Sequence, residues 1–217
     1  MTFYRCWWWL AYAVAFLLLR VRVEGRQHIP LYGGVVLASN HTGLADPVII
    51  GVAAGRELWY LAKAELFAVP VIGSLIQKLN AMPVDRNRGD RGALMTWEQQ
   101  LKTGRAVLLF PEGTRNKTGR FFEPKPGVGM LVYRAQVPVV PVFISGTVHF
   151  WKALVGIERV TVRFGLPLVF DFSQLPEHRK SAYQAISRDV MIHIAQLKQR
   201  RREAGTVAPA SSAQQTA

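Results

Sequence analysis

Short apolar runs and stretches of helical hydrophobic spacing alternate along the chain from residue 34 onward. Alternation of this kind is typical of an α/β domain, in which helices cover a largely parallel sheet. The expected strands are the apolar runs 34–39, 58–62, 79–84, 106–110, 139–144 and 160–165. The pattern therefore predicts one α/β domain with a largely parallel mixed sheet flanked by helices.

Helical spacing is clearest in two segments. In 90–103 the residues Leu94, Trp97 and Leu101 recur on one face, and Gly104 follows as a stop signal. In 178–203 apolar residues again recur at helical spacing, which predicts a long helix with one face on the sheet. These residues are Tyr183, Ile186, Val190, Ile194 and Leu197.

The ends of the chain differ in composition from the middle. After residue 203 the chain is rich in Ala, Ser, Thr and Gln, and so offers little apolar area to offset the entropy of ordering. We expect the folded domain to span 24–203 and the tail 204–217 to be disordered. The Pro-containing segment 123–126 is expected to be a loop.

The N-terminal segment 1–23 is expected to be helical and to associate with membranes. An apolar run opens with three tryptophans and ends at Leu19, between Arg5 and Arg20. Counted from Cys6, the run has about 14 residues, short of the roughly 20 that a full span needs. Arg20, Val21 and Arg22 follow in place of a cleavage site. Since tryptophan prefers the lipid–water boundary, an interfacial or re-entrant anchor is favoured over a buried core helix.

The charge balance favours a polyanionic partner. Lys and Arg number 27 against 14 Asp and Glu, giving a net charge of +13. This balance fits an anionic bilayer or a nucleic acid. The basic residues are not interleaved with aromatic residues on one face, so nucleic acid is not expected as a partner. The single cysteine, Cys6, excludes a disulfide within one chain and fits a reducing compartment.

Polar residues at the end of the first predicted strand are the first candidate for chemistry. The run from Ser39 to Pro47 contains His41, Gly43 and Asp46. On a continuous helix His41 and Asp46 would lie about 140° apart, so the pair meets only if the backbone turns at Gly43. A carboxylate bonded to one imidazole nitrogen leaves the other nitrogen free to accept a proton. No Gly-x-Ser-x-Gly elbow occurs in the chain, which disfavours a covalent serine enzyme and leaves open a nucleophile supplied by the substrate.

A second candidate follows the strand 106–110. Phe110, Pro111, Glu112, Gly113, Thr114 and Arg115 close this strand, and the earlier strand 79–84 leads into Asp85 and Arg86. Glycine allows a ligand to approach the backbone closely, and arginine binds phosphate through two parallel hydrogen bonds. Each of these segments alone is more often a surface loop with solvated charges. Together with His41 they suit a polyol phosphate ligand.

With these blocks in view, the sequence resembles the glycerolipid acyltransferase family, which contains the 1-acylglycerol-3-phosphate acyltransferases. The marks of that family are a His-x4-Asp block and a Phe-Pro-Glu-Gly-Thr-Arg block, and both occur here in order. The Asp85-Arg86 block and the block 137–141 fall where two further motifs of the family belong. The resemblance covers residues 24–195.

The resemblance implies a role for each matching residue. His41 would act as general base on the acceptor hydroxyl while that hydroxyl attacks a thioester, and Asp46 would orient His41. The glycerol phosphate would be bound by Arg86, Glu112, Gly113, Thr114 and Arg115. Pro138 and Pro141 would shape the side on which the acyl donor binds. The family often has Ser two residues after the His, where this chain has Gly43, and the change is expected to affect the choice of acceptor.

The resemblance also implies the substrates and the location of the enzyme. The acceptor would be 1-acyl-glycerol 3-phosphate and the product phosphatidate, with acyl-CoA or acyl carrier protein as donor and no further cofactor. Another lysolipid acceptor, such as lyso-ornithine lipid, stays open. The protein is expected on an anionic membrane surface, at the cytoplasmic face of the inner or plasma membrane. The other classes considered are a nucleic-acid-binding protein and a non-catalytic membrane scaffold. No metal site is expected, because no residue stands at metal-ligand spacing near His41.

Overall fold

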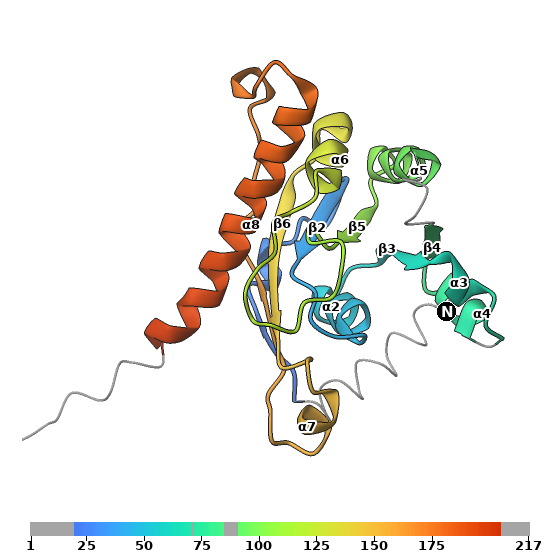
Figure 1. The fold of residues 1–217 in the computed structure, drawn as a ribbon, viewed down its shortest axis with the longest axis vertical. Coiled ribbons are helices and arrows are strands. Elements are labelled where there is room, and N and C mark those ends of the chain that lie inside the picture. The colour runs from blue at the N-terminus through green and yellow to red at the C-terminus, as the bar shows by residue number, and fades with distance from the viewer. Residues whose placement is uncertain (1–19, 71, 85–90, 205–217) are drawn as a thin grey trace, which may run out of the picture.

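The computed structural model describes residues 20–70, 72–84 and 91–204, and these form the predicted α/β architecture (Figure 1). Within these residues a seven-stranded sheet has the order β1-β7-β6-β2-β5-β3-β4. The strands are β1 (Arg22–Glu24), β2 (Val35–Ser39), β3 (Leu58–Lys63), β4 (Ala81–Val84), β5 (Ala106–Leu109), β6 (Val139–Ser145) and β7 (Thr161–Phe164). The mixed, mostly parallel sheet that the sequence predicts is therefore confirmed.

The direction of the strands determines which loops meet. β2 pairs in parallel with β5 on one side and with β6 on the other, and β3 and β4 continue the parallel set. β7 runs antiparallel to β6, and β1 is parallel to β7. The carboxyl ends of β2, β5 and β6 therefore lie at one edge of the sheet, where ligands of open α/β sheets usually bind.

Helices cover both faces of the sheet. α2 (Asp46–Ala54) covers one face, while α5 (Arg91–Lys102), α6 (Gly127–Ala135) and α8 (Arg179–Ala204) cover the other (Figure 1). The alternation along β2 explains this arrangement, because Val35 and Leu37 join the core around α2 while Val36 and Ala38 face α6 and α8. The shorter elements are η1 (Arg26–His28), α3 (Ala64–Phe67), α4 (Ile72–Lys78), α7 (Phe150–Leu154) and η2 (Phe172–Gln174).

All six expected strands and both expected long helices are present, each within two residues of its predicted ends. β1 has only three residues, too few for its hydrophobic pattern to predict it. α6 was also not predicted, because Gly127 and Gly129 weaken its helical signal. Gly129 is needed for packing, since a Cβ on it would lie 1.9 Å from the carbonyl oxygen of Tyr183 in α8.

Most of the two expected terminal segments lies beyond the residues that the structure describes. Residues 1–19 of the expected membrane segment and residues 205–217 of the expected tail lie outside the described residues. The domain boundaries at 24 and 203 stay predictions. Within the described ranges, no helix is both long and apolar enough to cross a bilayer.

Candidate active site

The loop between β2 and α2 brings His41 and Asp46 together. His41 lies two residues beyond β2, and Asp46 is the first residue of α2, with Pro47 next. The Nδ1 atom of His41 lies 2.9 Å from Oδ2 of Asp46, whose side chain is completely buried. The predicted turn between the two residues is therefore present, and the helix begins at the residue that contacts the imidazole.

One oxygen of the Asp46 carboxylate holds the whole loop. Besides the His41 ring, Oδ2 accepts hydrogen bonds from the backbone N–H of Thr42 at 2.6 Å and from that of Gly43 at 2.8 Å. A carboxylate is an acceptor only, so His41 donates through Nδ1 and Nε2 is left as the basic nitrogen. The loop and the tautomer are thus fixed by the same buried group.

The imidazole is also held from the side. The ring of Phe110, which follows β5, stacks on the His41 ring with a centroid distance of 4.0 Å and an interplanar angle of 19°. The backbone N–H of Asn116 donates to the carbonyl of His41 at 2.7 Å. Both contacts come from the loop that contains the Phe-Pro-Glu-Gly-Thr-Arg block, so the two predicted motifs meet at the carboxyl edge of the sheet.

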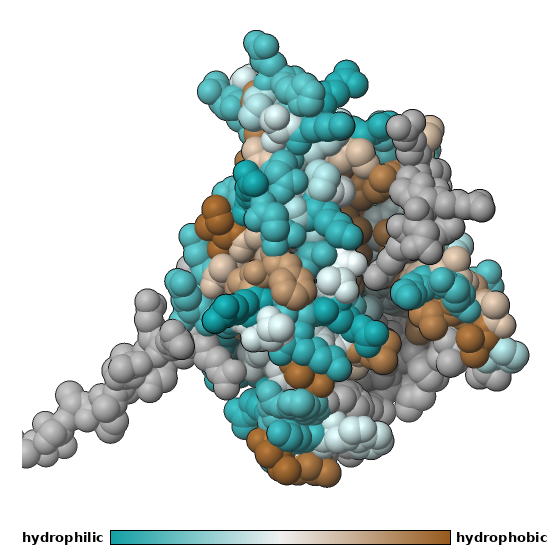
Figure 2. Space-filling view, in the orientation of Figure 1, coloured by the Kyte–Doolittle hydropathy of each residue, from teal (hydrophilic) through white to brown (hydrophobic). Residues whose placement is uncertain are grey.

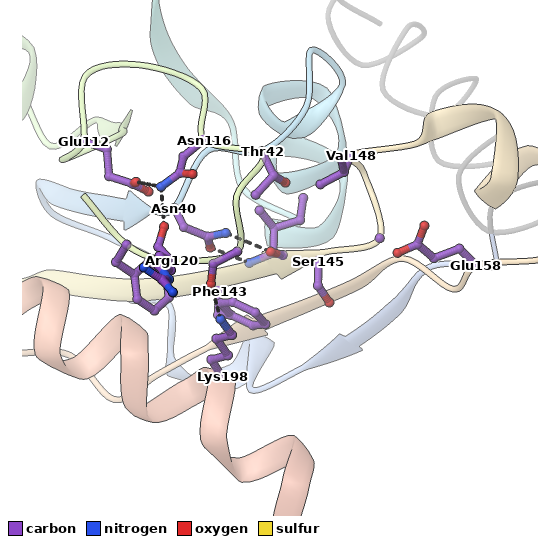
Figure 3. Close-up of a pocket in the computed structure, with 14 residues that line it drawn as sticks. Asn40, Thr42, Glu112, Asn116, Arg120, Phe143, Ser145, Val148, Glu158 and Lys198 are labelled. Atoms are coloured by element: carbon purple, nitrogen blue, oxygen red, sulfur yellow. Dashed lines mark hydrogen bonds between the residues drawn. The ribbon is translucent and has the colours of Figure 1, made fainter.

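Glu112 is buried and engaged in this second loop. Its Oε2 accepts a hydrogen bond from Asn116 Nδ2 at 2.7 Å, which Figure 3 shows, and another from the backbone N–H of Phe122 at 3.0 Å. Asn116 Nδ2 also donates to the carbonyl of Arg120. The carboxylate thus closes the loop 112–122 on itself, and this geometry favours a positioning role for Glu112.

The remaining predicted residues of the second loop face outward. Gly113 has a φ of +67°, a conformation that lets the chain turn directly after Glu112. Thr114 and Arg115 are exposed. The side chain of Lys125, which was not among the predicted residues, packs over Gly113 so closely that a Cβ on the glycine would lie 2.8 Å from the Lys125 Cδ. Arg86 lies outside the described residues.

His41 and Asp46 form a dyad, and four polar residues outside the predicted set support the loop that carries it: Asn40, Thr42, Asn116 and Thr147. The amide of Asn40 exchanges two 2.9 Å hydrogen bonds with the backbone of Ile144 in β6. The hydroxyls of Thr42 and Thr147 hydrogen-bond to each other at 2.7 Å. Asn40 directly precedes His41 in the sequence, which was a local signal. Thr147 had none, because its partner Thr42 is 105 residues away, whereas the side-chain partner of Asn116, Glu112, is four residues away.

A pocket of about 190 Å³ opens beside the dyad loop at the same edge (Figure 3). Its lining includes Asn40 and Thr42 from the dyad loop, and it also includes Arg120, Ser145 and Lys198. The Oγ atom of Ser145 is buried and has no hydrogen-bond partner among the described residues. The pocket thus offers space beside Asn40 and Thr42, the two residues that flank His41 in sequence.

Other expected contributions lie differently. The N–H of Gly113 is bonded to the carbonyl of Phe110 at 2.9 Å, which closes the turn after β5. Pro138 precedes β6 at the sheet edge opposite His41, and Pro141 is buried within β6. No group of three His, Cys, Asp or Glu side chains suited to a metal ion occurs in the part of the chain that the structure describes.

Comparison with known proteins gives a consistent result. The family model described as Acyltransferase matches residues 20–145. A 1-acyl-sn-glycerol-3-phosphate acyltransferase of Bacillus subtilis is 32% identical over 164 residues, which are 75% of this chain and 81% of that protein. A protein of the same name from Borreliella burgdorferi is 25% identical over 80% of this chain and 71% of its own length.

A solved structure shares the fold. The crystal structure of the 1-acyl-sn-glycerophosphate acyltransferase PlsC from Thermotoga maritima superposes with a TM-score of 0.68. The match covers 90% of this chain and 81% of the other chain at 24% identity. The arrangement of sheet and helices described above is therefore also found in PlsC.

Proposed function

Because the chain belongs to the acyltransferase family and is an O-acyltransferase, we propose that it moves a fatty acyl group from a thioester to the sn-2 hydroxyl of 1-acyl-glycerol 3-phosphate. The product is phosphatidate, a precursor in phospholipid biosynthesis. The names of the relatives support this acceptor. The observation that carries the mechanism is the His41–Asp46 pair, with its carboxylate held by two backbone amides.

His41 acts as the general base of the transfer. Its Nε2 accepts the proton of the acceptor hydroxyl while the hydroxyl oxygen bonds to the thioester carbonyl carbon. The C–S bond then breaks, and the departing thiolate takes the proton from the imidazolium. Asp46 stabilises the imidazolium through Nδ1, and its burial without competing solvent strengthens that interaction.

The nucleophile comes from the acceptor. Within residues 20–70, 72–84 and 91–204, no hydroxyl or thiol is hydrogen-bonded to the Nε2 atom of His41. This arrangement supports direct transfer from donor to acceptor over a covalent acyl-enzyme. The donor is acyl-CoA or acyl carrier protein, which takes part as a substrate, and the reaction needs no further cofactor.

Basic residues of the second loop bind the acceptor phosphate. Arg115 is exposed on the loop whose backbone is bonded to His41, and Lys125 packs over the adjoining Gly113. Arg86 is a further phosphate ligand in this proposal. Gly113 and Thr114 bind the glycerol phosphate between them, whereas Glu112 acts by holding the loop. In this proposal the enzyme acts at the cytoplasmic face of the inner or plasma membrane, on lipid substrates.

A comparison of acceptors tests the substrate. The purified protein is given an acyl thioester, as the CoA ester or on acyl carrier protein, with 1-acyl-glycerol 3-phosphate, 1-acyl-glycerol or lyso-ornithine lipid. We expect phosphatidate formation to exceed both other reactions. Equal or faster acylation of lyso-ornithine lipid would contradict the proposed acceptor.

A pair of variants tests the phosphate contact. Arg115→Ala should raise KM for 1-acyl-glycerol 3-phosphate by about 10-fold or more, because a hydrogen bond to a charged group contributes roughly 1.5–3 kcal/mol. Lys117→Ala, which removes another exposed cation of the same loop, is the matched control and should change KM little. Equal effects of the two variants would indicate general attraction by the basic loop instead of a phosphate contact at Arg115.

A further inference from the structure

The connection between β6 and β7 exposes large apolar side chains at the tip of the molecule. It contains the short helix α7, and around this helix Trp151, Val155 and Ile157 are 75%, 68% and 76% exposed. Figure 2 shows the hydrophobic surface at the lower tip, where Figure 1 places α7. We name residues 148–159 the α7 loop.

The α7 loop is a built structure that holds these side chains outward. Ala153 is buried in the core around α2 and anchors the helix. The carbonyl of Lys152 accepts hydrogen bonds from the N–H groups of Ile157 and Glu158, at 2.8 and 3.1 Å, and closes the turn. Since the turn is closed by backbone bonds, its fold does not require large apolar residues at the surface.

The charges around the apolar residues are mainly basic. Lys152, Arg159 and His149 are exposed, whereas the only acidic residue of the α7 loop, Glu158, is partly buried and lines the pocket beside the dyad loop (Figure 3). A tryptophan with aliphatic neighbours and lysine or arginine at its flanks is the combination that binds the interface of an anionic bilayer.

The α7 loop is joined to the candidate active site. It follows Thr147, whose hydroxyl is bonded to that of Thr42 beside His41. The carbonyl of Thr147 packs so closely on Gly43 that a Cβ there would lie 2.4 Å away. Leu44, in the same turn, is also exposed. The α7 loop therefore lies at the same edge of the sheet as His41 and Asp46, and a bilayer that binds this loop would lie close to the dyad.

We propose that the α7 loop is a membrane-binding element that enters the headgroup region of an anionic bilayer and presents the dyad to lipid substrates. The inference rests on the proposed function, because a lipid acceptor must be taken from the bilayer. The α7 loop is separate in sequence from the expected N-terminal anchor, and its proposed partner is a lipid bilayer.

A site-specific probe tests insertion directly. The single cysteine is removed by Cys6→Ser, and an environment-sensitive fluorophore is attached after Val155→Cys or, as the control, after Val169→Cys. Val169 is also exposed but lies next to Leu168, which pairs with Val139 at the opposite edge of the sheet. With vesicles of phosphatidylcholine and phosphatidylglycerol, the probe at 155 should shift to the blue and be quenched by nitroxide-labelled lipid. The probe at 169 should do neither.

Three results of the probe experiment would overturn the inference. An unchanged probe at 155 in the presence of vesicles excludes insertion. A blue shift that depends on protein concentration and occurs without vesicles indicates a second copy of the chain as the occupant. Emission in the dilute protein without vesicles that is already blue-shifted relative to the probe at 169 indicates that another segment of the chain covers the loop.

An activity comparison separates this inference from the proposed function. Val155→Glu with Ile157→Glu should lower the vesicle partition coefficient and the acylation rate on vesicles by about 10-fold, because aliphatic burial supplies much of interfacial binding. The rate on a short-chain, water-soluble lysophosphatidate should stay unchanged. Leu166→Glu with Val169→Glu is the matched control. Inactivity of the wild type on the soluble acceptor would contradict the proposed function, whereas equal vesicle binding by all variants would contradict only the role of the α7 loop.

Discussion

At the scale of single residues, the Asp46 carboxylate explains most of the geometry of the dyad. Its Oδ2 accepts three hydrogen bonds, from the His41 ring and from the N–H groups of Thr42 and Gly43. The sequence predicted that the backbone turns at Gly43 and that the pair meets, and the structure contains this contact. The catalytic roles of the two residues stay predictions.

Gly43 has a second consequence that the sequence did not indicate. The carbonyl of Thr147 occupies the space that a side chain at position 43 would take. Thr147 follows β6, more than 100 residues away along the chain, so only the folded sheet reveals the contact. Close packing of this kind depends on tertiary structure and leaves no local pattern in the sequence.

Glu112 provides a test at the residue scale. Glu112→Gln should retain activity within several-fold, because an amide oxygen can accept the same bonds from Asn116 and Phe122. Glu112→Ala should lower kcat/KM by about 10-fold or more, since the buried donors lose their acceptor at a cost of roughly 1–3 kcal/mol. Steady-state kinetics gives kcat/KM for both variants. Equal inactivation by both changes would show that the negative charge itself is required.

At the scale of elements, hydrophobic periodicity predicted the strands β2 to β7 and the two long helices but not β1 or α6. The strands β2, β5 and β6 are buried on both faces and therefore appear as continuous apolar runs. α6 contains glycines, and its helical state depends on packing against α8. Propensity alone does not predict a helix that is stabilised mainly by its neighbour.

Two glycines of α6 form a matched pair for a stability measurement. Gly129→Ala should lower the free energy of unfolding by about 2 kcal/mol or more, because the added Cβ would clash with the carbonyl of Tyr183. Gly127→Ala has open space and should raise the free energy by roughly 0.5 kcal/mol. Urea denaturation gives both values. A stable Gly129→Ala variant would contradict the close contact between α6 and α8.

Glu98 in α5 forms an ion pair with Arg134 in α6, and the contribution of this pair to stability depends on pH. Hydrogen bonds from Lys102 and Arg134 hold the pKa of Glu98 below its usual value, against the opposing effect of burial. In the window between the folded and the unfolded pKa the unfolded chain binds more protons. The stabilisation is therefore complete above the ordinary glutamate pKa and is lost as the pH falls through the lower folded value.

A single substitution tests this linkage. Glu98→Gln should make the acid-induced decrease in the free energy of unfolding less steep. Glu123→Gln, which removes an exposed ion pair with Arg188, is the matched control and should have a smaller effect because solvent screens that pair. Urea denaturation at several pH values gives the comparison. A variant whose pH dependence equals that of the wild type would contradict the stabilising role of the Glu98 pair.

At the scale of the whole molecule, the topology gathers the chemistry at one edge. The dyad loop after β2, the basic loop after β5 and the α7 loop after β6 all lie at the carboxyl ends of neighbouring strands. The sequence predicted the first two as neighbours because both follow apolar strands. The position of the α7 loop was not predicted, since its exposed residues become recognisable only when burial is known.

The net charge of +13 fits this arrangement. An anionic bilayer attracts a basic protein over a distance of about 10 Å at ordinary ionic strength, which is enough to concentrate the enzyme near its lipid substrates. The charge does not determine the orientation of the molecule. The outward apolar residues of the α7 loop supply a specific contact. Because this loop lies beside the dyad, binding through it turns the dyad towards the bilayer.

The most direct test of the account is the rate of acyl transfer to 1-acyl-glycerol 3-phosphate by the wild type, His41→Ala and Asp46→Asn, measured from low to saturating substrate concentrations. General base catalysis contributes about 10²- to 10⁴-fold, so kcat should fall by that range in His41→Ala. Asp46→Asn should lower kcat as well, with little change in KM. A His41→Ala enzyme that retains the wild-type kcat would contradict the dyad mechanism.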